Sequence, residues 1–152
     1  MKKFPLLFFA AALAVLALDQ ATKYYIRTHL GHFDVVHILP FLDIVYAENT
    51  GSAFGMFRSF GSTFFIIIST AAVAALSILI IKDSHGRTAY ALLLGGAAGN
   101  LLDRVLYGHV IDFIDIYAGS LHWPAFNIAD SALTIGIAIL FIKAFFGSCR
   151  TH

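Results

Sequence analysis

The stretch FGSTFFIIISTAAVAALSILII, residues 60–81, contains no charged side chain. An α-helix of about 20 apolar residues is long enough to cross the hydrocarbon core of a bilayer. Neither Pro nor a run of turn residues interrupts the segment, so it predicts one continuous transmembrane helix. The rest of the chain must therefore be interpreted with lipid as part of its solvent.

The composition of the whole chain agrees with a membrane protein. Of its 152 residues, 59% are hydrophobic and 12% are charged, and the mean hydropathy is +0.82. Soluble domains carry about 25% charged residues, roughly twice this fraction. The net charge of +1 provides no basic surface for nucleic acid. Cys149 is the single cysteine and cannot form an internal disulfide. The length predicts one domain over residues 1–152.

Three further apolar segments flank the first one. They predict helices at about 4–26, 88–106 and 127–146, which with 60–81 makes four transmembrane helices. The first segment has a second interpretation, because Lys2 and Lys3 followed by an alanine-rich apolar run resemble a secretory signal peptide. Since three more apolar segments follow, a retained first helix is the simpler prediction.

An even number of helices places both chain ends on one side of the membrane. Basic residues favour the cytoplasmic side, and the first helix usually has the most weight. Six basic residues fall on the side of the chain ends and four on the other, so we expect cytoplasmic termini. The first group is Lys2, Lys3, Lys82, Arg87, Lys143 and Arg150, and the second is Lys23, Arg27, Arg58 and Arg104.

The first outer connection, about residues 27–59, is long enough to contain structure of its own. Residues 34–38 and 41–46 are rich in β-branched and aromatic residues, with Pro40 between them, and predict two short strands. The second outer connection, about 107–125, is expected to be a loop. The predicted fold class is an all-α membrane protein of four transmembrane helices with a small extracytoplasmic β-sheet on the outer membrane surface.

Ionisable residues inside a span are costly and usually face the bundle interior. Asp19 and Lys23 are four residues apart and share one helix face, where they can form an ion pair. A purely structural pair and a pair that shapes a polar site are both compatible with this spacing.

The segment 88–106 combines a close-packing motif with a polar face. Gly95 and Gly99 form a Gly-x-x-x-Gly pattern that permits close helix contact. Asn100, Asp103 and Arg104 follow at spacings that place them on one face. Helix packing explains the glycines, but lipid offers no partners to the three polar groups.

Two further acids fall near the outer membrane surface. Asp112 lies between Ile111 and Phe113, and Asp130 lies three residues after Asn127 at the start of the last helix. An acid in the first helical turn is favourable as a cap, and this explains Asp130 alone. It does not explain two acids at one depth.

Two carboxylates in one cavity can hydrolyse a peptide bond. Repulsion keeps one of them protonated while the other is ionised, so that one can activate water and the other can polarise a carbonyl. A proton-coupled transporter and a structural membrane subunit remain open alternatives from spacing alone. No Ser–His pair is present, and His29, His32 and His37 lack the spacing of a metal site, so we expect no metal and no cofactor.

Five polar motifs, taken in order, resemble those of the bacterial lipoprotein signal peptidases, or signal peptidase II. They cover the chain from Asp19 to about Ser131, and their order is more specific than any one of them. The motifs are Asp19-Gln-Ala-Thr-Lys23, Glu48-Asn-Thr-Gly-Ser-Ala-Phe-Gly55, Gly95-Gly-Ala-Ala-Gly-Asn-Leu-Leu-Asp-Arg-Val105, Val110-Ile-Asp-Phe113 and Phe126-Asn-Ile-Ala-Asp130.

The resemblance implies an aspartic endopeptidase of the bacterial inner membrane. It would cut diacylglyceryl-modified prolipoproteins just before the lipid-modified cysteine and hold its active site near the outer leaflet. The sequence leaves the oligomeric state open, and a monomer is our expectation. Asp112 and Asp130 would be catalytic, the outer sheet would cradle the substrate, and residues 51–57 would form a lid with Gly51 as a hinge. The residues that bind substrate or support the site would be Asn49, Gly51, Asn100, Arg104, Asn127, Asp19 and Lys23.

Overall fold

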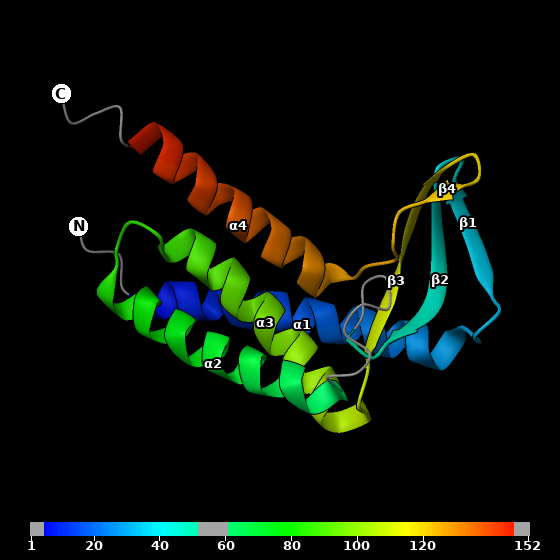
Figure 1. Ribbon diagram of the computed structural model, residues 1–152, viewed down its shortest axis with the longest axis horizontal. Helices are drawn as coiled ribbons and strands as arrows, with labels where there is room; N and C mark the ends of the chain where they lie inside the picture. Colours follow the sequence, from blue (N-terminus) through cyan, green and yellow to red (C-terminus); the bar gives the residue numbers. More distant parts are fainter. Residues whose placement is uncertain (1–4, 52–60, 148–152) are drawn as a thin grey trace.

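The computed structural model describes residues 5–51 and 61–147, which form a helical bundle with a small sheet at one end (Figure 1). Most of the chain is helical, and the sheet lies where the connections between helices are longest. The elements in chain order are α1 (Pro5–His29), β1 (Val35–Leu39), β2 (Leu42–Asn49), α2 (Gly61–Lys82), α3 (Arg87–Tyr107), β3 (Val110–Ala118), β4 (Leu121–His122) and α4 (Ile128–Gly147).

The helix positions predicted from apolar runs are confirmed to within a few residues. α1 continues three residues beyond the expected end at residue 26. Within residues 5–51 and 61–147, three helices are long and apolar enough to cross a membrane, namely α1, α2 and α4. α3 has a suitable length but does not reach this apolar composition, because Asn100, Asp103 and Arg104 lie in its C-terminal half.

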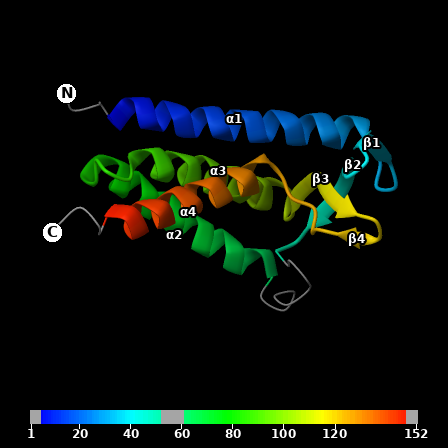
Figure 2. The ribbon, with the colours of Figure 1, turned by 90° about the horizontal axis from the view of Figure 1, so that it is seen from above.

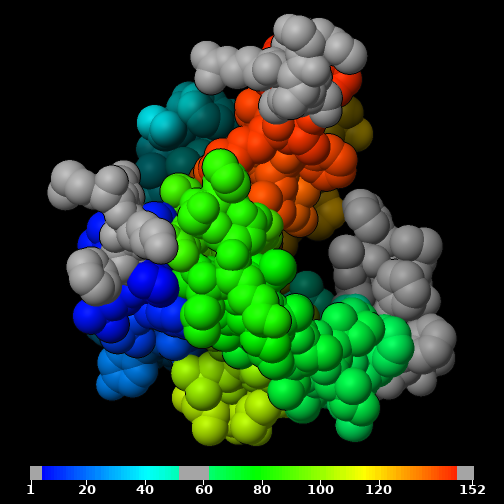
Figure 3. Space-filling model, turned by 90° about the vertical axis from the view of Figure 1, so that its left-hand side faces the viewer, coloured from blue at the N-terminus to red at the C-terminus, as the bar shows by residue number. Residues whose placement is uncertain are grey.

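α3 is the centre of the bundle, and its position explains its composition. It packs against α1, α2 and α4, and its buried residues are mostly alanine, glycine and leucine. Figure 3 views the end at which α1 begins and α4 ends, and shows the α2–α3 turn between those two helices. A helix surrounded by protein in this way does not need an apolar surface on every side.

Glycines allow α1 and α4 to approach α3 closely. A Cβ atom on Gly95 would lie 2.6 Å from the carbonyl oxygen of Ala12 in α1. A Cβ atom on Gly96 would lie 2.5 Å from the carbonyl oxygen of Ala129 in α4. The predicted close-packing role of this segment is therefore confirmed, and it serves two neighbouring helices.

The sheet is antiparallel, with strand order β1-β2-β3-β4. The two strands predicted before α2 are present as β1 and β2. The prediction of a simple loop over residues 107–125 was wrong, because β3 and β4 lie in it. Asp112 is a strand residue that pairs with Ala47 of β2. A local sequence pattern does not reveal such a long-range interaction.

The strands run across the direction of the helices, at the end where α1 and α3 finish and α4 begins (Figures 1 and 2). A small apolar cluster joins the two parts, in which Ile26 of α1 packs with Ile111 and Phe113 of β3. This contact fixes the first half of β3, and with it Asp112, at the helix ends.

Candidate active site

Asp112 of β3 and Asp130 of α4 line one groove between the sheet and the start of α4. The groove has a volume of about 580 Å³ and an apolar wall that includes Trp123, Phe126 and Ile135. Asp112 is 3% exposed, and Asp130 is partly buried. The two acids predicted to act together are therefore in a common site, although eighteen sequence positions separate them.

Three asparagine side chains donate hydrogen bonds to the two acids. Asn49 Nδ2 lies 2.9 Å from Asp112 Oδ2, and Asn127 Nδ2 lies 2.7 Å from Asp112 Oδ1. Asn100 Nδ2 lies 2.8 Å from Asp130 Oδ1. These donors come from β2, α3 and the residue before α4, so each acid is held by a segment other than its own.

The opposite atom of each amide has a partner that fixes its orientation. Asn49 Oδ1 accepts the backbone N–H of Gly51 at 2.9 Å, and Asn127 Oδ1 accepts that of Asp130 at 2.9 Å. Asn100 Oδ1 accepts a hydrogen bond from Lys23 Nζ at 2.9 Å. Because an ammonium or N–H can only donate, each amide must turn its own NH₂ group toward a carboxylate.

Gly51 has a backbone requirement that supports this arrangement. Its φ of 114° lies where residues with a side chain are strained, and a Cβ atom would lie 2.3 Å from the Phe65 ring. Gly51 thus turns the chain sharply enough to present its N–H to Asn49. Residues 52–57 of the predicted lid lie outside the described part of the chain.

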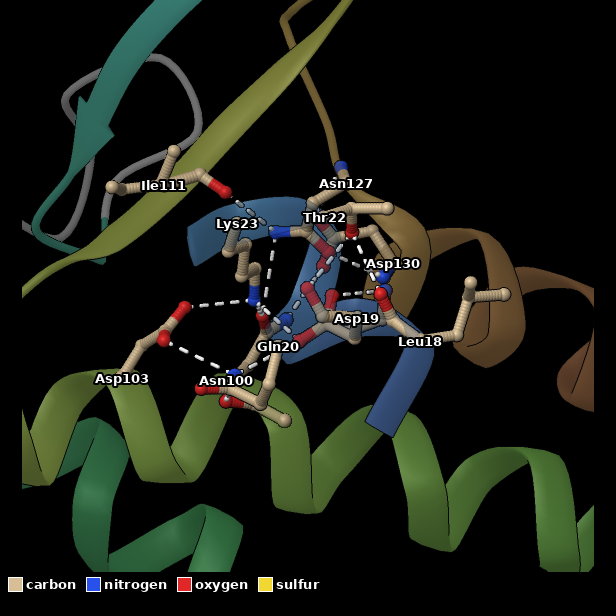
Figure 4. Close-up of polar contacts among 12 residues, drawn as sticks. Leu18, Asp19, Gln20, Thr22, Lys23, Asn100, Asp103, Ile111, Asn127 and Asp130 are labelled. Carbon is tan, nitrogen blue, oxygen red and sulfur yellow. Dashed lines mark hydrogen bonds and ion pairs between the residues drawn. The ribbon is translucent and has the colours of Figure 1, made fainter. Parts of the chain in front are cut away.

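Lys23 is completely buried and lies at the centre of an ion cluster between α1 and α3 (Figure 4). Its ammonium is 2.8 Å from Asp19 Oδ2 and 2.8 Å from Asp103 Oδ2. Arg27 approaches Asp103 Oδ1 at 3.8 Å. The predicted Asp19–Lys23 pair is present, and Asp103 completes it from α3.

The ion cluster is connected to the two acids of the groove through two charged residues of α1, Lys23 and Asp19. Lys23 binds Asn100, which donates to Asp130, while Asp19 Oδ1 accepts the backbone N–H of Ala129 at 2.9 Å. α1 therefore holds α3 and the first turn of α4 in register. Removing one member would leave an uncompensated buried charge, which typically costs about 3–5 kcal/mol.

Two members of this network were missed among the sequence-based site residues. Asp103 was assigned to a polar face without a partner, and Gln20 was not singled out. Gln20 Nε2 lies 3.2 Å from Asp19 Oδ2, from the carbonyl oxygen of Gly99 and from Asp103 Oδ1. An amide side chain inside an otherwise apolar segment was the available signal.

Arg104 lies near the acids without an ion pair to them at salt-bridge distance. Its Nη1 donates to the Asn100 carbonyl oxygen at 3.3 Å, and its guanidinium lies 5.2 Å from the centre of the Phe65 ring. Its Nε is buried and has no protein partner in the described structure. The Asp103 carboxylate, one residue before Arg104, instead lies 2.8 Å from Lys23 and 3.8 Å from Arg27.

Burial raises the pKa of the Asp112 carboxyl to about 6, and the Asp130 carboxylate adds to the rise. The hydrogen bonds from Asn49 and Asn127 act in the opposite direction by stabilising the ionised form. Asp112 therefore changes protonation state near neutral pH, where an acid–base group is most useful.

The described residues contain no group of three histidine, cysteine or acidic side chains close enough to hold a metal ion. The polar residues that line the groove are the two acids, Asn49, Ser131 and Thr134, and the carboxylates accept hydrogen bonds from fixed amide donors. This arrangement can place a water molecule and a carbonyl group between two acids, which is what hydrolysis without a metal requires.

Comparison with known proteins identifies the family. Residues 11–146 match the family model described as signal peptidase (SPase) II. The lipoprotein signal peptidase of Thermodesulfovibrio yellowstonii is 50% identical over 129 residues, which are 85% of this chain and 88% of the relative. That of Chlorobium phaeobacteroides is 44% identical over 151 residues, which are 90% of this chain and 94% of the relative.

A solved structure of a bacterial membrane enzyme superimposes with a TM-score of 0.90 at 38% identity, covering 99% of this chain and 94% of that one. The same overall fold thus occurs in an enzyme of membranes, in agreement with the three apolar helices found here. Sequence motifs, family match and fold all lead to one assignment. The chain belongs to the signal peptidase II family, the peptidases that process prolipoproteins.

Proposed function

We propose that this chain is an aspartic endopeptidase that removes signal peptides from diacylglyceryl-modified prolipoproteins, cutting just before the lipid-modified cysteine. The observation that carries the proposal is the common groove of Asp112 and Asp130, in which three asparagines direct N–H donors at the two carboxylates. A transporter or a structural subunit would not need two acids arranged around one open groove.

The reaction follows from one shared proton. The ionised carboxylate removes a proton from a water molecule, whose oxygen attacks the scissile carbonyl carbon, while the neutral carboxyl donates its proton to the carbonyl oxygen. The tetrahedral intermediate then collapses, the C–N bond breaks, and the cysteine nitrogen receives a proton. The products are a free signal peptide carboxylate and a lipoprotein with a new N-terminal cysteine.

The other site residues position these groups. Asn49, Asn100 and Asn127 hold the carboxylates, Gly51 orients Asn49, and Lys23 with Asp19 holds Asn100 and the start of α4. Arg104 has an unpartnered buried Nε beside the site and is proposed to bind a substrate carbonyl.

The groove is proposed to lie near the outer leaflet of the bacterial inner membrane, with both termini in the cytoplasm. α3 is proposed as a fourth span because it lies among three helices that can each cross the membrane. The whole chain, residues 1–152, would act as one domain and one monomeric enzyme. A substrate held in the outer leaflet by its acyl chains would then present its scissile bond at the depth of the two acids.

The test uses purified protein with a diacylglyceryl-modified prolipoprotein, and follows release of the signal peptide. Asp112→Asn and Asp130→Asn should each abolish cleavage, because either change removes one of the two acids that share the proton. Both variants should still insert into the membrane and fold, which their membrane level and thermal stability would show. A chelator should leave wild-type cleavage unchanged. Near-normal turnover by either variant would exclude the proposed pair of catalytic acids.

A further inference from the structure

The chain that joins β4 to α4 runs beside β3 and is bonded to it through the main chain (Figure 1). We call residues 123–126 the connecting segment. Trp123 donates its backbone N–H to the Ile116 carbonyl oxygen at 2.8 Å, and Phe126 exchanges two hydrogen bonds with Ile114, at 2.8 and 3.1 Å. The connecting segment therefore continues the pairing that begins between β3 and β4.

The connecting segment has one residue more than the part of β3 that it faces. The β3–β4 ladder ends at Tyr117 and His122, and the next pair is Ile114 with Phe126, so two residues of β3 lie opposite three of the segment. This is the count of a β-bulge, in which the extra residue leaves the ladder. Bulges are frequent next to active sites, where they change the direction of the chain.

The bulge leaves the main chain of Pro124 and Ala125 without partners. Because Trp123 and Phe126 direct their N–H groups at β3, the polar groups of the two residues between them point to the opposite side. Within residues 5–51 and 61–147, no hydrogen bond is made by the Ala125 N–H or by the carbonyl oxygens of Pro124 and Ala125. Both residues are partly exposed, so these three groups can meet a ligand.

This unpaired edge opens into the groove of the two acids. Pro124 and Ala125 line the groove together with Asp112 and Asp130. Asn127, the residue after the connecting segment, donates to Asp112 at 2.7 Å. An unpaired strand edge is a template on which another extended chain can add as a strand. The groove thus offers main-chain donors and acceptors a few residues away from its carboxylates.

The order of residues along the groove indicates which part of a substrate would meet this edge. The partners of the connecting segment, Ile114 and Ile116, lead along β3 away from Asp112. On the other side of the acids the groove continues from Asp130 to Ile135, along the apolar helix α4. A signal peptide has an apolar central region, which would follow α4. The residues after the scissile bond would then follow the edge.

We propose that the residues following the lipid-modified cysteine bind to Ala125 in extended form, as a β-strand added to the connecting segment. This proposal rests on the proposed function, because it concerns how that substrate is held. The substrate chain would lead away from the acids while the connecting segment leads toward them, so the pairing is antiparallel. One substrate residue would then donate its N–H to the Ala125 carbonyl oxygen and accept the Ala125 N–H.

Main-chain pairing has a consequence for specificity. Hydrogen bonds to the backbone of an added strand supply affinity without a demand on its side chains. Ala125 would therefore position the scissile bond of substrates whose mature sequences differ, and its own contribution would come from its main chain.

An ester scan of the substrate tests the pairing with the wild-type enzyme. In a synthetic diacylglyceryl-modified prolipoprotein peptide, the peptide bonds after the cysteine are replaced one at a time by ester bonds, each of which removes one N–H. We expect kcat/KM to fall about fivefold for the ester opposite Ala125 and to change little for its two neighbours, whose N–H groups point away from the edge. An equal effect at every position, or no effect at any, would overturn the proposal.

Ala125→Pro removes the donor on the enzyme side. We expect kcat/KM to fall about fivefold with the full peptide, and much less with a peptide that ends at the cysteine amide and has no residue to pair. Tm reports whether the variant folds, and the ester scan decides the question if it does not. Equal losses with the two peptides would contradict the proposal, because they would mean that proline disturbs the acids themselves.

A binding measurement separates this inference from the proposed function. A diazirine amino acid is placed in the mature part of the peptide, and its cross-links to the full-length Asp130→Asn protein are located by mass spectrometry. Cross-links to residues 123–126 without cleavage by the wild-type enzyme would disprove the proposed function and leave the edge as a binding site. Cleavage with cross-links only to other segments would have the reverse meaning.

Discussion

At the scale of single residues, the site depends on which atom of each asparagine faces a carboxylate. Gly51 N–H, Asp130 N–H and the Lys23 ammonium each bind the amide oxygen, so the amide nitrogen is left for the acids. One buried lysine therefore influences an acid that it does not touch, by holding Asn100. The same logic predicts how the acids respond to pH and to loss of a donor.

Asn49→Ala should move the alkaline limb of the kcat/KM profile to higher pH. Wild-type activity is expected to fall as pH rises through about 6, where Asp112 loses the proton that its raised pKa retains. The Asn49 N–H stabilises the ionised form, so its removal raises the pKa further. A hydrogen bond to a charged group is worth about 1.5–3 kcal/mol, which corresponds to a shift of about one to two pH units.

The measurement is the residual cleavage rate of the variant from pH 5 to 9 at substrate concentrations below KM. A limb that moves to lower pH would mean that Asn49 does not stabilise the ionised Asp112 carboxylate.

Arg104→Ala should reduce cleavage by about 100-fold, the typical effect of losing one positioned donor in an active site. Arg104→Lys should restore little, because lysine lacks the planar set of donors with which Arg104 faces the site and the Phe65 ring. If Arg104 only anchored the helix at lipid headgroups, lysine would serve equally well. Cleavage is compared at matched membrane levels, and full activity of Arg104→Lys would remove Arg104 from the site.

At the scale of elements, the decisive feature is the distance between α3 and its neighbours. Gly96 faces the carbonyl oxygen of Ala129, one residue before Asp130, and Gly136 of α4 faces Leu93. Both glycines lie at the α3–α4 interface. Gly96 faces the residue before Asp130, whereas Gly136 lies six positions after Asp130, near the middle of α4. The same one-carbon change can therefore be made directly beside Asp130 and almost two helical turns away from it.

Gly96→Ala should reduce cleavage at least about 100-fold, because its Cβ would displace the start of α4, and a shift of about 1 Å can cost that much in rate. Overpacking typically costs about 1–3 kcal/mol of stability, and we expect both variants to lose an amount in this range. Gly136→Ala should nevertheless retain most of the cleavage activity. Tm is measured for each variant, and kcat is measured at a temperature well below the lower of the two Tm values. Equal loss of activity in the two variants would mean that stability alone explains the effect.

At the scale of the whole molecule, α1 begins and α4 ends at the same end of the bundle, while the sheet lies at the other (Figures 1 and 2). The groove lies between the sheet and the start of α4. The short connection between α2 and α3 is at the first end. If α3 crosses the membrane with the other helices, one end is cytoplasmic and the other faces outward.

Reporter fusions at His152 and within the Lys82–Arg87 turn should both behave as cytoplasmic, because the four-span arrangement assigns six of the ten basic residues of the sequence to that side. A fusion near Ser120, in the β3–β4 connection, should behave as external and serves as the control. An external signal from His152 would contradict the arrangement of four spans.

The sequence by itself determined the membrane class of the protein, the positions of its helices, two of its strands and the identity of the paired acids. Apolar runs of sufficient length and polar groups within them are local properties, and ordered motifs such as Val110–Phe113 and Phe126–Asp130 are specific without any coordinates. The Asp19–Lys23 pair followed from helix periodicity for the same reason.

Only the tertiary structure decided how these parts meet. β3 was hidden because Asp112 becomes a strand residue through pairing with β2, more than sixty positions away. Asp103 and Gln20 acquired their roles because α1 packs on α3, and the amide orientations depend on donors from three separate segments. The unpaired edge at Ala125 likewise appears only once the register of residues 123–126 against β3 is known.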